Sequence, residues 1–262
     1  MKRDTLFPPI SMLVLAVAAL AASGCTTIKV IPLKDAFPVS ASAYQSGPAV
    51  VLLPIEESFE KEEGSARFKA DPTFLGKSLD RYLGLGMVLP VVLSFEESHL
   101  DMPRAEGVRR AVLARLQDRG IPADYQNEGG VEKLQNFPPA QLGVSLRLRR
   151  LGVERKRSFL LPSPLTWVIM RDTIISQVAL DCQVWQPGQP APVGKATVKV
   201  SKDDLGLPAT TAAAVDECFK ISGLLETRAR LSSESHARLL GACPSNSFRP
   251  APGNLKTVRA RT

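Results

Sequence analysis

Residues 174–200, IISQVALDCQVWQPGQPAPVGKATVKV, decide the fold of this chain. Apolar or small residues alternate with polar ones, a period of two that is typical of a β-strand with one buried face. The alternation stops at the Pro- and Gly-rich segment 186–194 and resumes at 195–200. This pattern predicts an antiparallel hairpin with a long turn. The positions expected to face the core in its first strand are Ile174, Ser176, Val178, Leu180, Cys182 and Val184.

Two further strands and a helix are predicted before this hairpin. The continuous apolar run 49–55 is typical of a strand buried on both faces. Residues 144–149 alternate and predict a strand with one face in water. Residues 103–119 carry charges on one side and an apolar stripe on the other, and Gly120 supplies a stop signal, so they predict an amphipathic helix. Its stripe consists of Val108, Val112, Leu113 and Leu116.

The last predicted element is helical, and it completes the fold class. Residues 210–240 are rich in Ala, Leu, Glu and Arg and predict one or two helices, with a break near Ser222–Gly223. Strand, helix, antiparallel strands and helix in that order indicate an α+β fold, a mainly antiparallel sheet with one or two packing helices. We expect this domain to cover residues 48–243.

The first residues are typical of an export signal. Lys2 and Arg3 precede residues 10–22, which carry no charge. A helix of that length spans about 20 Å, whereas a bilayer core needs about 30 Å. The run therefore has the length of a signal-peptide core rather than of a membrane span. Residues 23–25, Ser-Gly-Cys, follow it directly.

Ala22-Ser23-Gly24-Cys25 resembles the lipobox of bacterial lipoproteins, although that family usually has Leu where this chain has Ala22. The resemblance implies a signal peptide at residues 1–24, with diacylglycerol joined to Cys25 and a fatty acid such as palmitate on its amino end. Thr26 in place of Asp implies the outer membrane, with the protein on its periplasmic face. The alternatives are an ordinary secretory signal with a chance cysteine, and an uncleaved helix.

Both ends of the expected domain carry segments without periodicity. Residues 26–47 contain Pro, Ser and Ala, and we expect residues 25–47 to form a lipidated tether that lifts the domain from the membrane. Residues 244–262 hold basic residues and no acid, and we expect a disordered basic tail.

The order of elements over residues 48–200 supports a second resemblance. A first strand containing Val-Val-Leu-Leu-Pro (50–54), a helix ending at Asp-Arg-Gly-Ile (118–121) and an antiparallel hairpin follow one another. This order resembles the α/β module of envelope lipoproteins related to the curli-secretion lipoprotein and to the N-terminal domain of the translocation protein TolB. The resemblance implies an assembly or accessory role and brings no catalytic residues.

The charge of the chain limits its partners. There are 33 Lys and Arg residues against 26 Asp and Glu, a formal net charge of +7. In an exported protein this excess does not indicate nucleic acid, and it favours lipid headgroups, lipopolysaccharide phosphates or an acidic protein. The alternative is a generally basic surface. The stretch 147–157 followed by an apolar segment predicts an anionic-ligand surface, against the alternative of a charged strand face followed by packed residues. That surface comprises Arg147, Arg149, Arg150, Arg155, Lys156, Arg157 and Trp167.

The cysteines fit an exported protein. Cys218 and Cys243 can pair, and a closed loop of that size contributes about 3 kcal/mol in the chain-entropy model. Cys182 is expected to pack as a small hydrophobic residue. The sequence has no C-x-x-C pair, so it predicts neither a thiol redox site nor a zinc site.

Acidic residues after two apolar runs are the remaining candidates for chemistry. They lie in 54–63, PIEESFEKEE, and 94–101, SFEESHLD. If the two loops met, they could hold a hard cation such as calcium, and the alternative is two solvated loops. The residues concerned are Glu56, Glu57, Glu96, Glu97, His99 and Asp101. The sequence predicts no catalytic residue, no metal ligand and no cofactor, since its two histidines, His99 and His236, belong to no known catalytic pattern.

Two functional hypotheses follow. The first is a membrane-anchored, periplasm-facing lipoprotein that is not an enzyme and acts as a binding or accessory component of envelope assembly or transport. Its partners would be the membrane, through lipidated Cys25, and an envelope protein or lipid. The second is an envelope hydrolase or metal-binding enzyme that uses the Glu-rich loops.

Overall fold

The structure is a computed structural model. It describes residues 25–39, 49–59, 66–85, 89–126, 129–130, 132, 138, 141–160, 169–203 and 205–239. The expected signal peptide and the expected basic tail lie outside the described residues, as do parts of the segments that join the elements.

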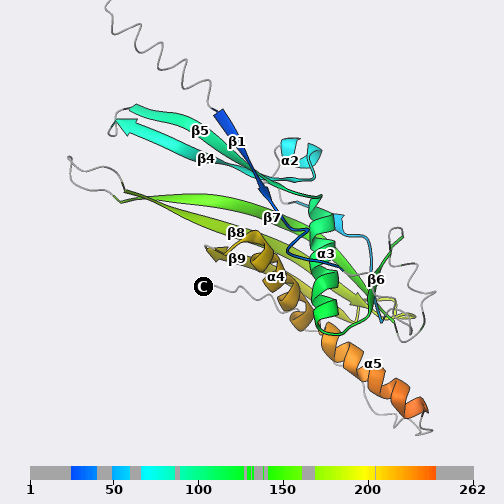
Figure 1. Cartoon of the computed structure of the whole chain (residues 1–262). Coiled ribbons are helices and arrows are strands. Elements are labelled where there is room, and N and C mark those ends of the chain that lie inside the picture. The colour runs from blue at the N-terminus through cyan, green and yellow to red at the C-terminus, as the bar shows by residue number, and fades with distance from the viewer. Residues whose placement is uncertain are drawn as a thin grey trace, which may run out of the picture.

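Figure 1 shows two sheets and the helices packed beside them. One sheet has the strand order β1-β5-β4, and the other has the order β6-β2-β7-β8-β9 with β3 beside β7. The α+β fold class is confirmed. The strands are β1 (Cys25–Ile31), β2 (Val50–Leu52), β3 (Glu56–Glu57), β4 (Phe74–Leu85), β5 (Leu89–Leu100), β6 (Ala123–Tyr125), β7 (Leu142–Leu160), β8 (Ile169–Trp185) and β9 (Gly194–Asp203). The helices are α2 (Ala66–Ala70), α3 (Arg104–Asp118), α4 (Leu207–Ile221) and α5 (Leu224–Leu239).

The predicted hairpin is confirmed as β8 and β9. The two strands pair antiparallel, from Val184 opposite Gly194 to Ile175 opposite Asp203. Burial alternates along β9, where Ala196, Val198 and Val200 are buried between exposed neighbours. Along β8, Ser176, Val178, Leu180, Cys182 and Val184 are buried as predicted, whereas Ile174 is only partly buried. Ile175 and Ala179, on the other face of this central strand, are buried as well. The two-residue period therefore orients both strands toward one core.

The other predicted elements are also present. β2 lies between β6 and β7, parallel to both, and is fully buried, as its apolar run predicts. The helix α3 buries Val108, Val112 and Leu116. It ends before Gly120, whose φ of 63° is a backbone conformation that glycine adopts without strain. The two C-terminal helices separate at Gly223, with φ 66°, as predicted.

The helices α3 and α4 cover one face of the larger sheet. α4 packs on β8 and β9, and α3 packs on α4. Asp216 on α4 joins the two helices, since Arg115 donates to it at 2.5 and 3.0 Å and Arg119 donates at 2.9 Å. Burial raises the pKa of Asp216, but the two guanidinium groups outweigh that effect and hold it below its ordinary value of 3.8. The pair of helices is therefore held by charge as well as by apolar contact.

The expected tether is wrong for residues 25–39. Residues 25–31 form β1, which pairs parallel to β5, and the next turn buries Leu33 and Phe37 in the core. Leu33 reaches α3 at Gly107, where an added Cβ would lie 2.6 Å from the Leu33 Cδ1 atom. The apolar residues of this segment have no regular period, so the sequence did not predict a strand there. They are ordered by pairing with the distant strand β5 and by packing against Gly107, where the missing side chain leaves room for Leu33.

The expected loops at 54–63 and 94–101 are also wrong in part. Glu56 and Glu57 form β3 beside β7, and Glu96 and Glu97 lie within β5. β4 and β5 form a long antiparallel hairpin, with register shifts between Phe74 and Gly76 and on both sides of Arg81. These irregularities break the two-residue period, which explains why the sequence pattern did not reveal the hairpin.

The structure corrects the predicted disulfide. Cys182 on β8 and Cys218 on α4 are bonded, with their Cα atoms 6.1 Å apart, so Cys218 is not available to Cys243. Cys243 lies outside the described residues. Cys182 faces the core as expected, but as one half of a disulfide rather than as a packed thiol. Both cysteines are on the interface between α4 and the sheet, which brings them together although 36 residues separate them.

Removal of the Cys182–Cys218 bond should lower the free energy of unfolding. The chain-entropy model gives about 4 kcal/mol for a loop of this size. We expect Cys182→Ala and Cys218→Ala each to lower the thermal midpoint strongly, and Cys243→Ala to leave it unchanged. Thermal unfolding of the three variants checks this, and peptide mass mapping without reductant identifies the pair. A peptide joining Cys218 to Cys243 would contradict it.

The Asp216 ion pairs should make stability depend on acid. Because folding lowers the pKa of Asp216, its contribution is full above the ordinary value of 3.8 and is lost as pH falls through the folded value. We expect Asp216→Asn to lower the free energy of unfolding by about 1–3 kcal/mol at neutral pH. The substitution should have little effect at a pH below the folded pKa of Asp216, because the carboxyl group is protonated there. Denaturant unfolding across pH checks this. Asp118→Asn is the control, because its side chain also binds Arg115 but is 61% exposed, and it should cost under about 1 kcal/mol.

Candidate functional site

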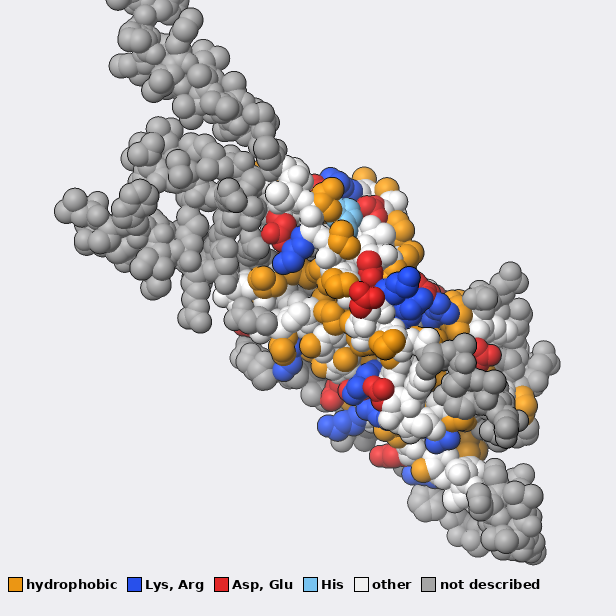
Figure 2. Space-filling view, viewed as in Figure 1, with side chains coloured by type: hydrophobic (Ala, Val, Ile, Leu, Met, Phe, Trp, Pro, Cys, Tyr) orange, Lys and Arg blue, Asp and Glu red, His pale blue; other side chains and the backbone are white. Residues whose placement is uncertain are grey.

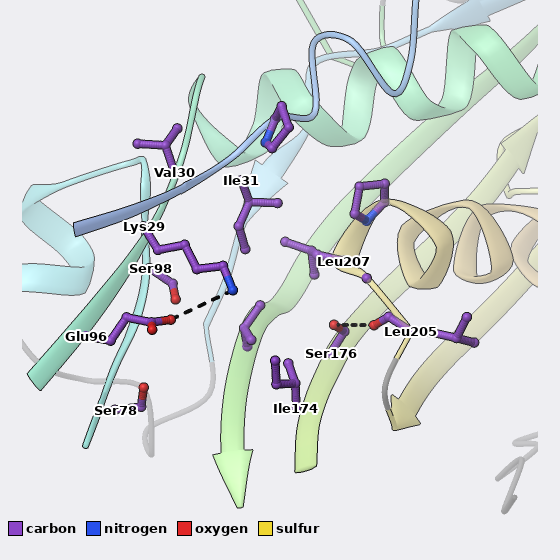
Figure 3. Close-up of a pocket in the computed structure, with 14 residues that line it drawn as sticks. Lys29, Val30, Ile31, Ser78, Glu96, Ser98, Ile174, Ser176, Leu205 and Leu207 are labelled. Carbon is purple, nitrogen blue, oxygen red and sulfur yellow. Dashed lines mark hydrogen bonds and ion pairs between the residues drawn. The ribbon is translucent and has the colours of Figure 1, made fainter. Parts of the chain in front are cut away.

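A cavity of about 340 Å³ lies between the two sheets. One wall comes from β1, β4 and β5, and the other comes from β7, β8 and the segment that starts α4 (Figure 3). This volume lies at the lower end of the range for small-molecule pockets, about 300–1,000 Å³. Its lining comprises Lys29, Val30, Ile31, Pro32, Ser78, Glu96, Ser98, Val153, Ile174, Ser176, Leu205, Gly206, Leu207 and Pro208.

The cavity forms because β8 is longer than the helix that covers it. The inward stripe of β8 is closed by α4 at Val178 and beyond, but α4 begins only at Leu207. Ile174 and Ser176 continue the same stripe past that point and face the cavity instead. On the opposite side, β1 brings Ile31 to the space that a helix would otherwise fill. The walls are therefore mainly apolar.

Few polar groups face this space. Lys29 on β1 lies 4.0 Å from the Glu96 carboxylate on β5, and the Lys29 side chain is half exposed while that of Glu96 is 15% exposed. The Ser176 hydroxyl donates to the Leu205 carbonyl oxygen at 2.8 Å. This bond fixes the segment before α4 to β8. A charged pair at one edge and apolar walls behind it suit a ligand with an apolar body.

The Glu-rich residues do not gather into a metal site within the described residues. No group of three or more His, Cys, Asp or Glu side chains there could hold a metal ion. Arg104 binds Glu57 at 3.2 Å, Arg147 binds Glu56 at 2.9 Å, and Asp101 accepts the backbone N–H groups of Leu33 and Lys34. The described carboxylates named here thus bind cationic side chains or backbone N–H groups of the protein itself.

Glu97 has the most enclosed of these carboxylates. Its side chain is 4% exposed and receives two bonds from Arg67 at 2.6 and 2.8 Å, while Lys77 lies 3.4 Å away. His99 lies nearby, with its Nδ1 atom 3.5 Å from Asp71 and 3.2 Å from the Thr73 hydroxyl. The Thr73 hydroxyl and backbone N–H donate to Asp71 and hold the pKa of Asp71 below 3.8. Two cations on one buried carboxylate make a structural ion-pair network.

Arg104, at the start of α3, is almost fully buried and was not identified from the sequence. Its guanidinium donates to three backbone carbonyl oxygens, those of Phe68, Asp71 and Phe74, at 2.7–3.0 Å. The same group stacks 4.1 Å from the Phe68 ring centroid and 4.8 Å from that of Phe59. An arginine suits this position because its planar fork satisfies several acceptors at once. Arg104 therefore fixes the turn between α2 and β4 against α3.

The predicted anionic-ligand surface is described only in part. Arg147 binds Glu56, and Arg149 lies at a register shift and binds Asp181 at 2.5 Å. A phosphate there would compete with those carboxylates. Arg150 has a partner as well. The side chains of Arg155, Lys156 and Arg157, and all of Trp167, lie outside what the structure describes. The surface as a whole stays a prediction.

On the face seen in Figure 2, the described residues form no large patch of a single charge. Hydrophobic side chains gather in the middle of this face, and blue and red side chains lie next to one another. Large exposed hydrophobic residues include Ile28 and Val30 on β1, at 68% and 56%, and Leu205 before α4, at 46%.

Sequence reasoning missed the cavity. Its walls come from six separate parts of the chain, and the residues that form them carry no shared motif. One signal was available in the sequence. The inward-facing residues of β8 begin at Ile174, and a helix of ordinary length packed on this strand would leave the first of them uncovered.

Comparison with known proteins gives distant similarity only. No family model and no curated protein matches the sequence. Among solved structures, a protein of family DUF330 from Xanthomonas campestris has 10% identity and a TM-score of 0.33, covering 82% of this chain and 98% of that chain. A neuraminyllactose-binding hemagglutinin homolog from Helicobacter pylori has 9% identity and a TM-score of 0.31, covering 78% and 96%.

Rare lipoprotein B from Shewanella oneidensis has 13% identity and a TM-score of 0.22, covering 72% of this chain and 97% of that chain. Bacterial lipoproteins are thus among the proteins that this chain resembles weakly. At TM-scores this low, the similarities carry no argument about its function. In the described residues, no helix combines the length and the apolar character needed to cross a bilayer.

Proposed function

We propose that this protein is a lipid-anchored, periplasm-facing component of a bacterial envelope that binds a ligand with an apolar chain and is not an enzyme. The observation that carries the proposal is the cavity of about 340 Å³ between the sheets, with its mainly apolar walls. Filling this cavity with an apolar chain is favourable, because each Å² of apolar surface removed from water contributes about 25 cal/mol.

The location rests on two features of the chain. Residues 22–25 carry the lipobox resemblance, and Cys25 would be the attached residue. The Cys182–Cys218 disulfide supports an oxidising compartment such as the periplasm, because thiols in the cytosol are kept reduced.

The lining of the cavity favours binding over catalysis. Serines 78, 98 and 176 contribute to it, but among the described residues no histidine, cysteine or aspartate does. A serine nucleophile needs a base within hydrogen-bond reach, and the Ser176 hydroxyl instead donates to a backbone carbonyl. Lys29 and Glu96 face each other at the edge, where they can bind the polar end of a ligand.

The anchor is tested by the mass of the N-terminal peptide from native membranes. We expect a peptide that begins at Cys25 and carries diacylglycerol and an acyl chain. We expect Cys25→Ala to abolish this modification and to lower the share of the protein in the membrane fraction, because its three acyl chains supply most of the attachment. An unmodified N-terminal peptide in membranes of wild-type cells would contradict the anchor.

Ligand binding is tested with cis-parinaric acid, a fluorescent fatty acid, on the purified and delipidated protein. We expect saturable binding, and we expect Ile174→Trp to weaken it about tenfold or more by filling the cavity, a loss of about 1.4 kcal/mol. Val193→Trp is the control, since Val193 is 44% exposed and does not line the cavity. Equal affinities for both variants, with unchanged circular dichroism, would place the ligand elsewhere and contradict the proposal.

A further inference from the structure

The hairpin of β4 and β5 extends past the first residue of β1. Cys25 pairs in register with Ser94, and β5 runs parallel to β1 from there. β5 itself begins at Leu89, five residues before Ser94, and β4 continues to Leu85 opposite it. At 3.2–3.4 Å for each residue, the hairpin reaches about 17 Å beyond the level of Cys25. Figure 1 shows the start of β1 and this end of the hairpin on the same side of the molecule.

The β4–β5 hairpin carries no charged residue beyond the level of Cys25. Residues 82–93 read YLGLGMVLPVVL and contain no charged residue. The last charged residue of β4 is Arg81, and its register partner is Ser94, which is also the partner of Cys25. The boundary between charged and uncharged residues thus coincides with the residue to which lipid would be attached.

The hairpin of β7 and β8 ends in the same manner. β4 and β7 approach closely, because a Cβ at Gly76 would lie 3.3 Å from the Val153 carbonyl oxygen. Five residues along from this contact lie Arg81 on β4 and Ser158 on β7. Residues 158–170, SFLLPSPLTWVIM, contain no charge, and Arg157 and Asp172 form the last charged register pair before them. Both hairpins therefore lose their charges at about the same level, and Figure 1 shows them pointing the same way.

We propose that the β4–β5 hairpin enters the membrane surface beside lipidated Cys25, with the adjoining end of β7 and β8 beside it. The inference rests on the proposed function for the identity of the anchor, but its charge and register argument stands without it. The uncharged strands lie at the boundary between headgroups and acyl chains, because open strand edges are costly in hydrocarbon and need polar partners. Arg81 and the basic residues 155–157 then lie at the level of anionic headgroups.

This arrangement connects the membrane to the cavity. Lys29 and Ile31, which line the cavity, follow Cys25 on the same strand, so the cavity lies just below the level of the anchor. A lipid acyl chain would have a short path from the bilayer surface to the cavity between the sheets.

The test uses the mature lipidated protein in vesicles of phosphatidylethanolamine and phosphatidylglycerol. A single environment-sensitive NBD label is placed at Val91→Cys in a Cys243→Ser background, since Cys182 and Cys218 are bonded to each other. The matched control carries the label at Lys199→Cys on β9, an exposed position. We expect a blue shift and quenching by doxyl-labelled lipid at residue 91 and neither at residue 199.

A charge variant gives a second readout. Leu83 and Val91 are register partners, and Leu83→Asp with Val91→Asp should abolish vesicle binding of the unlipidated Cys25→Ser protein, because anionic lipid repels carboxylates. Lys195→Ala with Lys199→Ala should leave that binding unchanged. Vesicle flotation measures both.

The outcomes separate this inference from the proposed anchor. A label at residue 91 that stays in water, on protein still attached through Cys25, overturns the inference and leaves the anchor intact. A shifted label on protein whose Cys25 carries no lipid supports the inference and removes the anchor. A blue shift without vesicles that grows with protein concentration would mean that a second copy covers this end, which also overturns the inference.

Discussion

The edge of β7 that faces away from β8 organises the whole molecule. β2 pairs with this strand at residues 142–144, β3 pairs at 147–148, and β4 approaches at 152–153. The three segments can share one strand because β2 and β3 are very short. The last approach brings backbones together at Gly76 and Gly152, where an added Cβ would lie 3.3 Å from a carbonyl oxygen of the opposite strand. Through β4, this contact also positions β5 and β1, and so the cavity between the sheets.

Ion pairs between distant segments hold these layers in register. Asp216 binds arginines of α3, Glu97 binds Arg67 and Lys77, and Glu57 binds buried Arg104. The pairs of Asp216 and Glu57 join elements that are far apart in the sequence, whereas Glu97 joins β5 to the neighbouring β4 and to α2. The described glutamates of the two Glu-rich stretches that take part in these pairs therefore belong to the scaffold.

The elements that could be predicted are those with an uninterrupted period. β8 and β9 keep a period of two, and α3 keeps a helical stripe with a glycine after it, so local residue order is sufficient for both. β4 and β5 were not predicted, because register shifts at Gly76 and Arg81 disturb their alternation. β1 was expected to be a tether, because its seven residues become a strand only through pairing with β5. The candidate site depends on these unpredicted strands, so it was missed with them.

The sequence by itself determined the α+β class, the hairpin of β8 and β9, the stop of α3 at Gly120 and the resemblance of residues 22–25 to a lipobox. Each of these depends on residues close together in the chain. Only the tertiary structure decided that Cys218 bonds Cys182, that β1 packs on the domain and that a cavity opens beyond the start of α4. The physical reason is that strand register and helix docking join residues tens of positions apart, as with Cys25 and Ser94, and local periodicity carries no information on such partners.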